Sequence, residues 1–151
     1  MENGERDLVW MELQTAAAVL DGELNTRLEA EAGMSSTDFQ ALWTLANAPE
    51  RSVTMSSLAA RLSMSASGTT RLGDRLVQRG WAQRRQDPHS RRVWFLCLTK
   101  EGAAATRQGY HVALRVRTDR VDRYLDDGEV AQLRSLLGKL LGHLEVEDVS
   151  R

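Results

Sequence analysis

Seven arginines gather in one stretch of the chain, residues 65–92, together with only two aspartates. The stretch therefore carries a net charge of +5, whereas the whole chain has a formal net charge of −1, so the remaining residues sum to −6. Guanidinium groups form forked hydrogen bonds with phosphate oxygens and with the edges of bases. A cluster of this kind predicts one surface that binds a polyanion.

The first half of this stretch has the pattern of a helix with one buried and one exposed face. Spacings of three and four residues predict a buried side made up of Thr69, Leu72, Leu76 and Val77. The opposite, exposed side consists of Ser67, Arg71, Arg75 and Gln78. Ser65 is the predicted N-cap and Gly80 the predicted left-handed residue after the helix, which would run from about Ala66 to Arg79.

The second half of the stretch predicts a β-hairpin. Residues 81–86 can extend, Asp87 to Ser90 have turn chemistry, and residues 91–99 are rich in β-branched and aromatic side chains. Four arginines flank the turn: Arg84, Arg85, Arg91 and Arg92. Such a finger fits insertion along a phosphate backbone or into a narrow minor groove, and the alternative is a solvated surface hairpin.

A shorter helix, Thr54 to Leu62, precedes the basic one. Met55, Leu58 and Leu62 share one side of it, and only a tight turn separates it from Ser65. Two helices joined in this way, the second with a basic outer face, form a helix-turn-helix, whose second helix enters the major groove of DNA. The basic hairpin extends the prediction to a winged helix.

The run MSSLAARLSMSASGTTRLGDRLVQRGWAQRRQDPHSRRVWFLCLTKEG resembles the central region of the MarR family (multiple antibiotic resistance regulators). It shares a leucine-rich recognition helix ending in RG, a wing with DP and paired arginines, and LT-x-x-G at the start of the next helix. The order of elements on both sides also fits, so the resemblance covers nearly the whole chain. Ser90 stands where the family's wing commonly has an aspartate, which affects the expected orientation of Arg91.

The segments around this region predict further helices. The first runs from Arg6 to about Ala32, and Thr37 with Gln40 fits a capping box for a second helix, Asp38 to Ala48. Residues 49–53 form a short connection. In the last wing strand, one alternating set is predicted to face the body of the protein, namely Trp94, Leu96 and Leu98. The opposite set points outward or toward a partner and consists of Val93, Phe95 and Cys97.

The C-terminal part predicts two more helices, Lys100 to Leu125, capped by Thr99, and a last one that starts with Asp126 and Glu129. The last helix has a regular apolar stripe, composed of Val130, Leu133, Leu137, Leu140 and Leu144. Because the terminal helices are apolar on more than one side, we expect them to pair with a second copy, and the alternative is an intramolecular bundle core. MarR-like proteins dimerise through these helices.

The expected fold is therefore mainly α with a small β-hairpin wing, in a single domain covering residues 1–151. Its winged-helix lobe spans about 37–99, and its dimerisation helices span about 5–32 and 100–146. The resemblance implies a homodimeric regulator, most often a repressor, that binds double-stranded DNA at a pseudo-palindrome with half-sites about 10 bp apart. A chain of this composition, without an apolar span or a secretory signal, is expected in the cytoplasm and not in a membrane.

Two sets of site residues follow from these expectations. The predicted base-reading end of the second helix comprises Ser65, Ser67, Thr69, Thr70 and Arg71, with Arg75 at the margin of the groove. The wing contributes the four arginines beside its turn. MarR-like proteins release DNA when a small aromatic or lipophilic anion binds between the dimer helices and the winged-helix lobe. Residues that could line such a crevice are Trp10, Met11, Leu13, Trp43 and His111, although such side chains are commonly core residues.

Other function classes find little support in the sequence. There is no phosphate-binding glycine loop, nucleophile elbow or H-E-x-x-H, so we expect neither an enzyme nor a cofactor. The three histidines are far apart and one cysteine cannot form a thiolate site, so no metal is expected. Cys97 is more typical of an inert small apolar residue than of a redox sensor. A winged helix that binds another protein remains the alternative, and its binding would depend little on salt.

Overall fold

A computed structural model of the chain describes residues 4–148, with side chains described for residues 4–142. The chain forms two compact units, Met1–Leu114 and Arg115–Arg151, each described by itself. The helices of the first unit are α1 (Gly4–Ala32), α2 (Ser36–Asn47), η1 (Pro49–Arg51), α3 (Met55–Arg61), α4 (Ala66–Gln78) and α5 (Lys100–Arg117), whose last turn lies beyond the boundary. Its strands are β1 (Ser52–Thr54), β2 (Ala82–Asp87) and β3 (Ser90–Leu98).

The turn between α1 and α2 differs from its prediction. Gly33 ends α1 with φ of 61°, a value that glycine adopts without strain. The capping box of α2 is formed by Ser35 and Asp38, because the Ser35 hydroxyl accepts from the Asp38 N–H and the Asp38 carboxylate accepts from the Ser35 N–H. The predicted pair, Thr37 and Gln40, was wrong, since the helix starts earlier, at Ser36.

The helix-turn-helix is confirmed in α3 and α4. Thr54 caps α3 by accepting from the Ser57 N–H, and Ser65 caps α4 by accepting from the Gly68 N–H, both at 3.1 Å. The buried side of α4 holds Thr69, Leu72 and Leu76, as predicted. Val77, which was predicted to be buried with them, is 38% exposed, because it lies at the edge of the apolar stripe.

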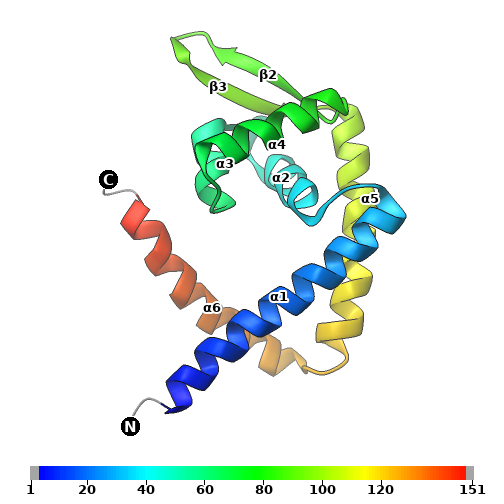
Figure 1. Cartoon of the computed structure of the whole chain (residues 1–151), viewed down its shortest axis with the longest axis vertical. Helices are drawn as coiled ribbons and strands as arrows, with labels where there is room; N and C mark the ends of the chain where they lie inside the picture. Colours follow the sequence, from blue (N-terminus) through cyan, green and yellow to red (C-terminus); the bar gives the residue numbers. More distant parts are fainter. Residues whose placement is uncertain (1–3, 149–151) are drawn as a thin grey trace. The chain divides into compact units, whose positions relative to one another are not determined.

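The strands form an antiparallel sheet in the order β1-β3-β2, and β2 and β3 extend beyond α4 as a hairpin (Figure 1). β1 lies in the segment predicted to be a connection. Leu96 is buried and Leu98 packs on the core, as predicted, but Trp94 is 43% exposed because it lies farther out along the hairpin. Cys97 was predicted to point outward and is buried, because β1 pairs with this end of β3 and brings the Ser52 hydroxyl to 3.4 Å from its sulfur.

The core of the first unit lies where α1 to α5 pack against the three-stranded sheet. Its fully buried large side chains are leucines and one methionine, namely Leu28, Met34, Leu42, Leu45, Leu58, Leu72, Leu76 and Leu96. By contrast, every described residue of α1 before position 23 is exposed. Only the C-terminal part of α1 therefore belongs to this core.

The second unit begins in the last turn of α5 and continues as a π-helical turn, η2 (Thr118–Asp122). The α-helix was predicted to extend to Leu125, but it ends at Arg117. α6 (Asp127–Asp148) then starts at the predicted Asp126 and Glu129 pair, whose side chains each accept from the other's backbone N–H at 2.9 Å. Large apolar side chains of α6 are exposed, including Val130, Leu133, Leu136, Leu140 and Leu141. The side chain of Leu144 lies outside the described residues.

Candidate nucleic-acid interface

The outward side of α4 is a polar ridge. Its members follow the helical repeat opposite the buried leucines, and they are Ser67, Arg71, Asp74 and Gln78. In the described part of the chain, Arg71 has neither an ion pair nor a side-chain hydrogen bond, so its guanidinium group can bind an external acceptor. Position and chemistry both fit a residue that contacts DNA.

The wing holds one flank of α4 through Arg84. Its Nη1 lies 2.8 Å from the Asp74 carboxylate, and its Nη2 donates to the Thr70 carbonyl at 3.4 Å. Asp74 is exposed, so the pair contributes little to stability by itself. It does fix the base of the wing against the helix, which makes Arg84 a link between the two predicted DNA-binding elements.

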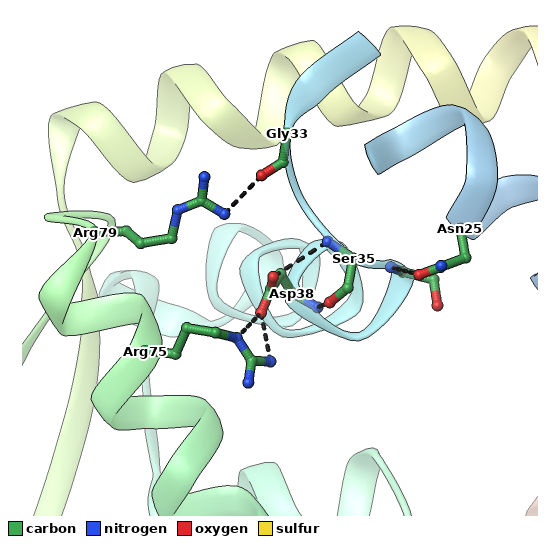
Figure 2. A network of polar contacts seen from close by, with 7 residues as sticks. Asn25, Gly33, Ser35, Asp38, Arg75 and Arg79 are labelled. Carbon is green, nitrogen blue, oxygen red and sulfur yellow. Dashed lines mark hydrogen bonds and ion pairs between the residues drawn. The ribbon is translucent and has the colours of Figure 1, made fainter. Parts of the chain in front are cut away.

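The opposite flank of α4 is held by the α1–α2 turn. Arg75 donates from Nε to one oxygen of Asp38 at 2.8 Å, and its Nη2 lies 2.7 Å from the same oxygen as an ion pair. One helical turn later, Arg79 donates from Nη1 to the Gly33 carbonyl at 2.7 Å and lies over the Trp81 ring. Figure 2 shows both arginines reaching from α4 to this turn. α4 is thus anchored from both sides.

The wing tip carries the remaining predicted arginines. Arg91 and Arg92 are exposed, and their guanidinium groups have no ion pair in the part of the chain that the structure describes. The turn before them is stabilised by the Asp87 carboxylate, which accepts from the His89 N–H at 2.7 Å, and by Gln86, which donates to the Arg91 carbonyl at 2.8 Å. With Ser90 in place of an acidic residue, these two bonds order the tip.

Arg85 lies between the tip and the base of the wing. Its Nη2 is 3.7 Å from the Glu50 carboxylate, and its guanidinium carbon is 5.8 Å from the centre of the Phe95 ring. Both Arg85 and Glu50 are largely exposed, so this ion pair is weak and water or phosphate can replace it. Arg85 can still turn toward an external anion.

The predicted base-reading residues divide into two groups. Ser67, Thr70 and Arg71 are exposed on α4, although the Thr70 hydroxyl also donates to the Ala66 carbonyl. Ser65 is exposed as well, but its hydroxyl caps the helix. Thr69 does not lie on the surface, since it is 1% exposed and its hydroxyl donates to the Ser65 carbonyl at 3.0 Å. Its assignment to a base contact does not fit this structure.

The predicted ligand-binding residues lie in two separate places. Trp43 of α2 stacks on Tyr110 of α5, with ring centres 5.2 Å apart, and His111 lies next to Tyr110 in a tilted arrangement. The others, Trp10, Met11 and Leu13, are exposed in the first turns of α1. At 1.5 Å per residue, Trp10 is about 27 Å along the helix from the buried Leu28. The structure therefore brings two of the five residues together, through Tyr110.

Sequence reasoning missed two of the residues that anchor α4, Asp38 and Arg79. Asp38 was assigned only as a helix start, and Arg79 only as the end of α4. The Ser-x-x-Asp spacing of Ser35 and Asp38 is a capping-box signal that could have identified the acidic residue. Its pairing with Arg75 joins positions 37 residues apart, which no local pattern predicts.

No group of three or more metal-ligating side chains occurs among the described residues. Likewise, none of the described helices is long and apolar enough to cross a membrane.

Comparison with known proteins finds one family whose model matches part of the chain. The family model for the MarR family matches residues 32–93, which include α2, the helix-turn-helix and the wing as far as Val93. The transcriptional repressor MprA of Escherichia coli (strain K12) is 37% identical over 84 residues, which are 56% of this chain and 47% of MprA. Over residues 32–93, the chain is similar to the MarR family.

Solved structures extend the likeness to MarR-family proteins beyond the matched segment. Sco3205 from Streptomyces coelicolor, a MarR family transcriptional regulator solved in complex with DNA, has a TM-score of 0.82 and 27% identity over 91% of this chain and 86% of Sco3205. A mutant MarR from E. coli complexed with operator DNA has a TM-score of 0.78 and 27% identity, covering 92% and 97% of the two chains. In sequence, however, the chain spans only about half the length of the curated relatives it matches.

Proposed function

We propose that this chain is a sequence-specific DNA-binding transcriptional regulator that acts as a homodimer. The observation that supports the proposal is that some arginines are bound within the protein whereas others are exposed to solvent. Arg75 and Arg84 hold α4 from both sides, whereas Arg71 on its outer ridge and Arg91 and Arg92 at the wing tip present guanidinium groups to solvent. A rigid helix and a charged finger with unoccupied donors fit a major groove and its neighbouring phosphates.

The dimer is supported by exposed apolar side chains on α1 and α6. On α1 these include Leu8, Val9, Trp10, Met11 and Val19, and α6 carries a comparable stripe. Apolar patches of this extent usually mark an interface. Two copies related by a two-fold axis present two recognition helices, which fits a pseudo-palindromic site.

The sign of regulation is proposed to be repression, released by a small lipophilic or aromatic anion. The relative MprA is a transcriptional repressor by name. The stacked Trp43 and Tyr110, with His111 beside them, offer aromatic surface for such a ligand. The chain is proposed to work in the cytoplasm, without enzymatic activity and without a cofactor.

Selection from a pool of random double-stranded DNA by the full chain tests the proposal. We expect enrichment of a pseudo-palindrome with half-sites about 10 bp apart. If a folded, dimeric protein enriches no sequence at either low or moderate salt, the proposal fails and a protein-binding winged helix becomes the better account.

A further inference from the structure

The turn between α1 and α2 is the point where several helices meet. Asp38 is 4% exposed at its side chain, and its carboxylate accepts from the Ser35 N–H with one oxygen and from Arg75 with the other. One carboxylate therefore both begins α2 and binds the recognition helix. Figure 2 shows this double use.

The same turn is bound to α1 and α5 as well. The Asn25 side chain of α1 accepts from the Ser36 N–H at 2.8 Å, and Gln108 of α5 donates to the Glu31 carbonyl at 2.9 Å. Arg79 adds the second contact from α4. These hydrogen bonds join the C-terminal end of α1 to α2, α4 and α5 at one place.

This joint relates the direction of α1 to the direction of α4. α1 continues from the joint for most of its 29 residues as an exposed helix with apolar side chains. A rotation of α4 against α1 would separate Arg75 from a buried carboxylate, and a buried charge without its partner is strongly unfavourable. The ion pair therefore resists that rotation in a way that exposed pairs such as that of Arg84 and Asp74 do not.

We propose that Asp38 is a positioning residue that, through Arg75, fixes the angle between α4 and α1 and thereby sets which spacing of DNA half-sites the dimer accepts. This inference rests on the proposed function, because α1 takes part in the dimer and α4 reads the DNA. Arg75 then contributes to binding by holding α4 and not by contacting phosphate, although its position on the recognition helix suggests the opposite.

The test compares operators that differ only in the spacing of their half-sites. The DNA is the sequence that the wild-type chain selects from a random pool, together with versions whose centre is one base pair shorter or longer. The variants are Asp38→Asn, which keeps the shape of the side chain but removes its charge, and Arg75→Gln. Asp21→Asn, at an exposed position of α1, is the matched control for the loss of one carboxylate.

We expect the wild type and Asp21→Asn to prefer one spacing strongly. Asp38→Asn should bind the preferred operator about tenfold more weakly, within the 5- to 150-fold range typical of coupling between sites. Its affinities for the three spacings should lie within about threefold of one another, because a loosened α4 adapts to each at similar cost. Arg75→Gln should reproduce this loss of spacing preference. The protein with both substitutions should bind the preferred operator no more weakly than either single variant. The salt dependence of binding by Arg75→Gln should stay that of the wild type.

Several results would overturn the inference. One is an Asp38→Asn protein that keeps the wild-type preference for one spacing of the half-sites. Another is an Arg75→Gln protein that loses affinity equally for all DNA with a salt slope lower by about one per subunit, which would make Arg75 a phosphate ligand. If Asp38→Asn does not fold, as judged by circular dichroism, the spacing preference of Arg75→Gln decides the test. Arg75 is 45% exposed, so its replacement disturbs the core less. A wild-type protein without any selected operator would instead overturn the proposed function itself.

Discussion

The arginines of residues 65–92 include some that are bound within the protein and some whose guanidinium groups face solvent. The sequence alone does not show which arginine belongs to which group. The helical repeat places both Arg71 and Arg75 on the polar side of α4, but Arg75 is bound to Asp38 while Arg71 has no ion pair in the described chain. The difference arises from α2, whose carboxylate reaches only one of them. Charge counting therefore predicts where an anion binds but overestimates how many arginines are available to bind it.

Replacing Arg71 with alanine tests the recognition helix. If Arg71 forms a forked contact with a guanine, its loss should cost roughly 1–3 kcal/mol on the selected operator and relax the preference at one base position. Titration of wild type and variant against operators substituted at each position measures this. Arg107→Ala, an exposed arginine of α5, is the control for charge and should leave the preference intact. An Arg71→Ala protein that kept full selectivity would mean that Arg71 does not contact a base.

Among the elements, the local signals predicted the helices well. Thr54, Ser65, Thr99 and Asp126 all cap the helices that the sequence assigned to them, because an N-cap bond joins residues only three apart. The strand β1 and the burial of Cys97 were not predicted, since both depend on the pairing of β1 with β3, more than forty residues later. With only three residues, β1 is too short for the alternation of its side chains to identify it as a strand.

The junction of the wing with α5 explains the glycine of the LT-x-x-G motif. Thr99 donates its hydroxyl to the Gly80 carbonyl and its N–H to the Trp81 carbonyl, which brings this backbone against the first turn of α5. A Cβ on Gly102 would lie 1.9 Å from the Trp81 carbonyl oxygen. Only a glycine allows the two segments to approach so closely.

Gly102→Ala should therefore lower the free energy of unfolding by about 1–3 kcal/mol or more, because the clash is with backbone. Chemical denaturation measures the change. Gly22→Ala is the matched control, since nothing lies within 4 Å of its added Cβ, and it should raise the stability by about 0.5–1 kcal/mol through helix propensity. Equal stability of Gly102→Ala and wild type would show that the junction can open without cost.

For the whole molecule, the sequence indicated an unusual amount of apolar surface at both ends of the chain, and the described side chains agree. Trp10 and Met11 on α1 and Leu133 and Leu140 on α6 are all exposed. The sequence could identify these stripes from their spacing but could not say what covers them, because a coiled-coil seam and a bundle core share one pattern. A second copy of the chain is the proposed partner.

Leu133→Asp combined with Leu140→Asp should convert the dimer into a monomer, because two charges per subunit would be buried in the interface. Analytical ultracentrifugation measures the mass, and binding to a DNA half-site should survive at much lower affinity. The control, Gln132→Asp with Ser135→Asp, adds the same charge on the polar side of α6 and should remain dimeric. If the protein with Leu133→Asp and Leu140→Asp remained dimeric, the dimer interface would lie elsewhere on the chain.

The central claim, that the arginine-rich wing and recognition helix bind DNA, is tested most directly by the salt dependence of operator binding. Wild type, Arg91→Ala with Arg92→Ala, and the equally charged control Arg107→Ala with Arg123→Ala are titrated over a salt series. Each phosphate contact contributes about 0.9 to the slope of log affinity against log salt, so a dimer lacking four wing arginines should lose up to about 3.6. The control should keep the wild-type slope. A shallow wild-type slope, or one that the wing substitutions leave unchanged, would contradict the account.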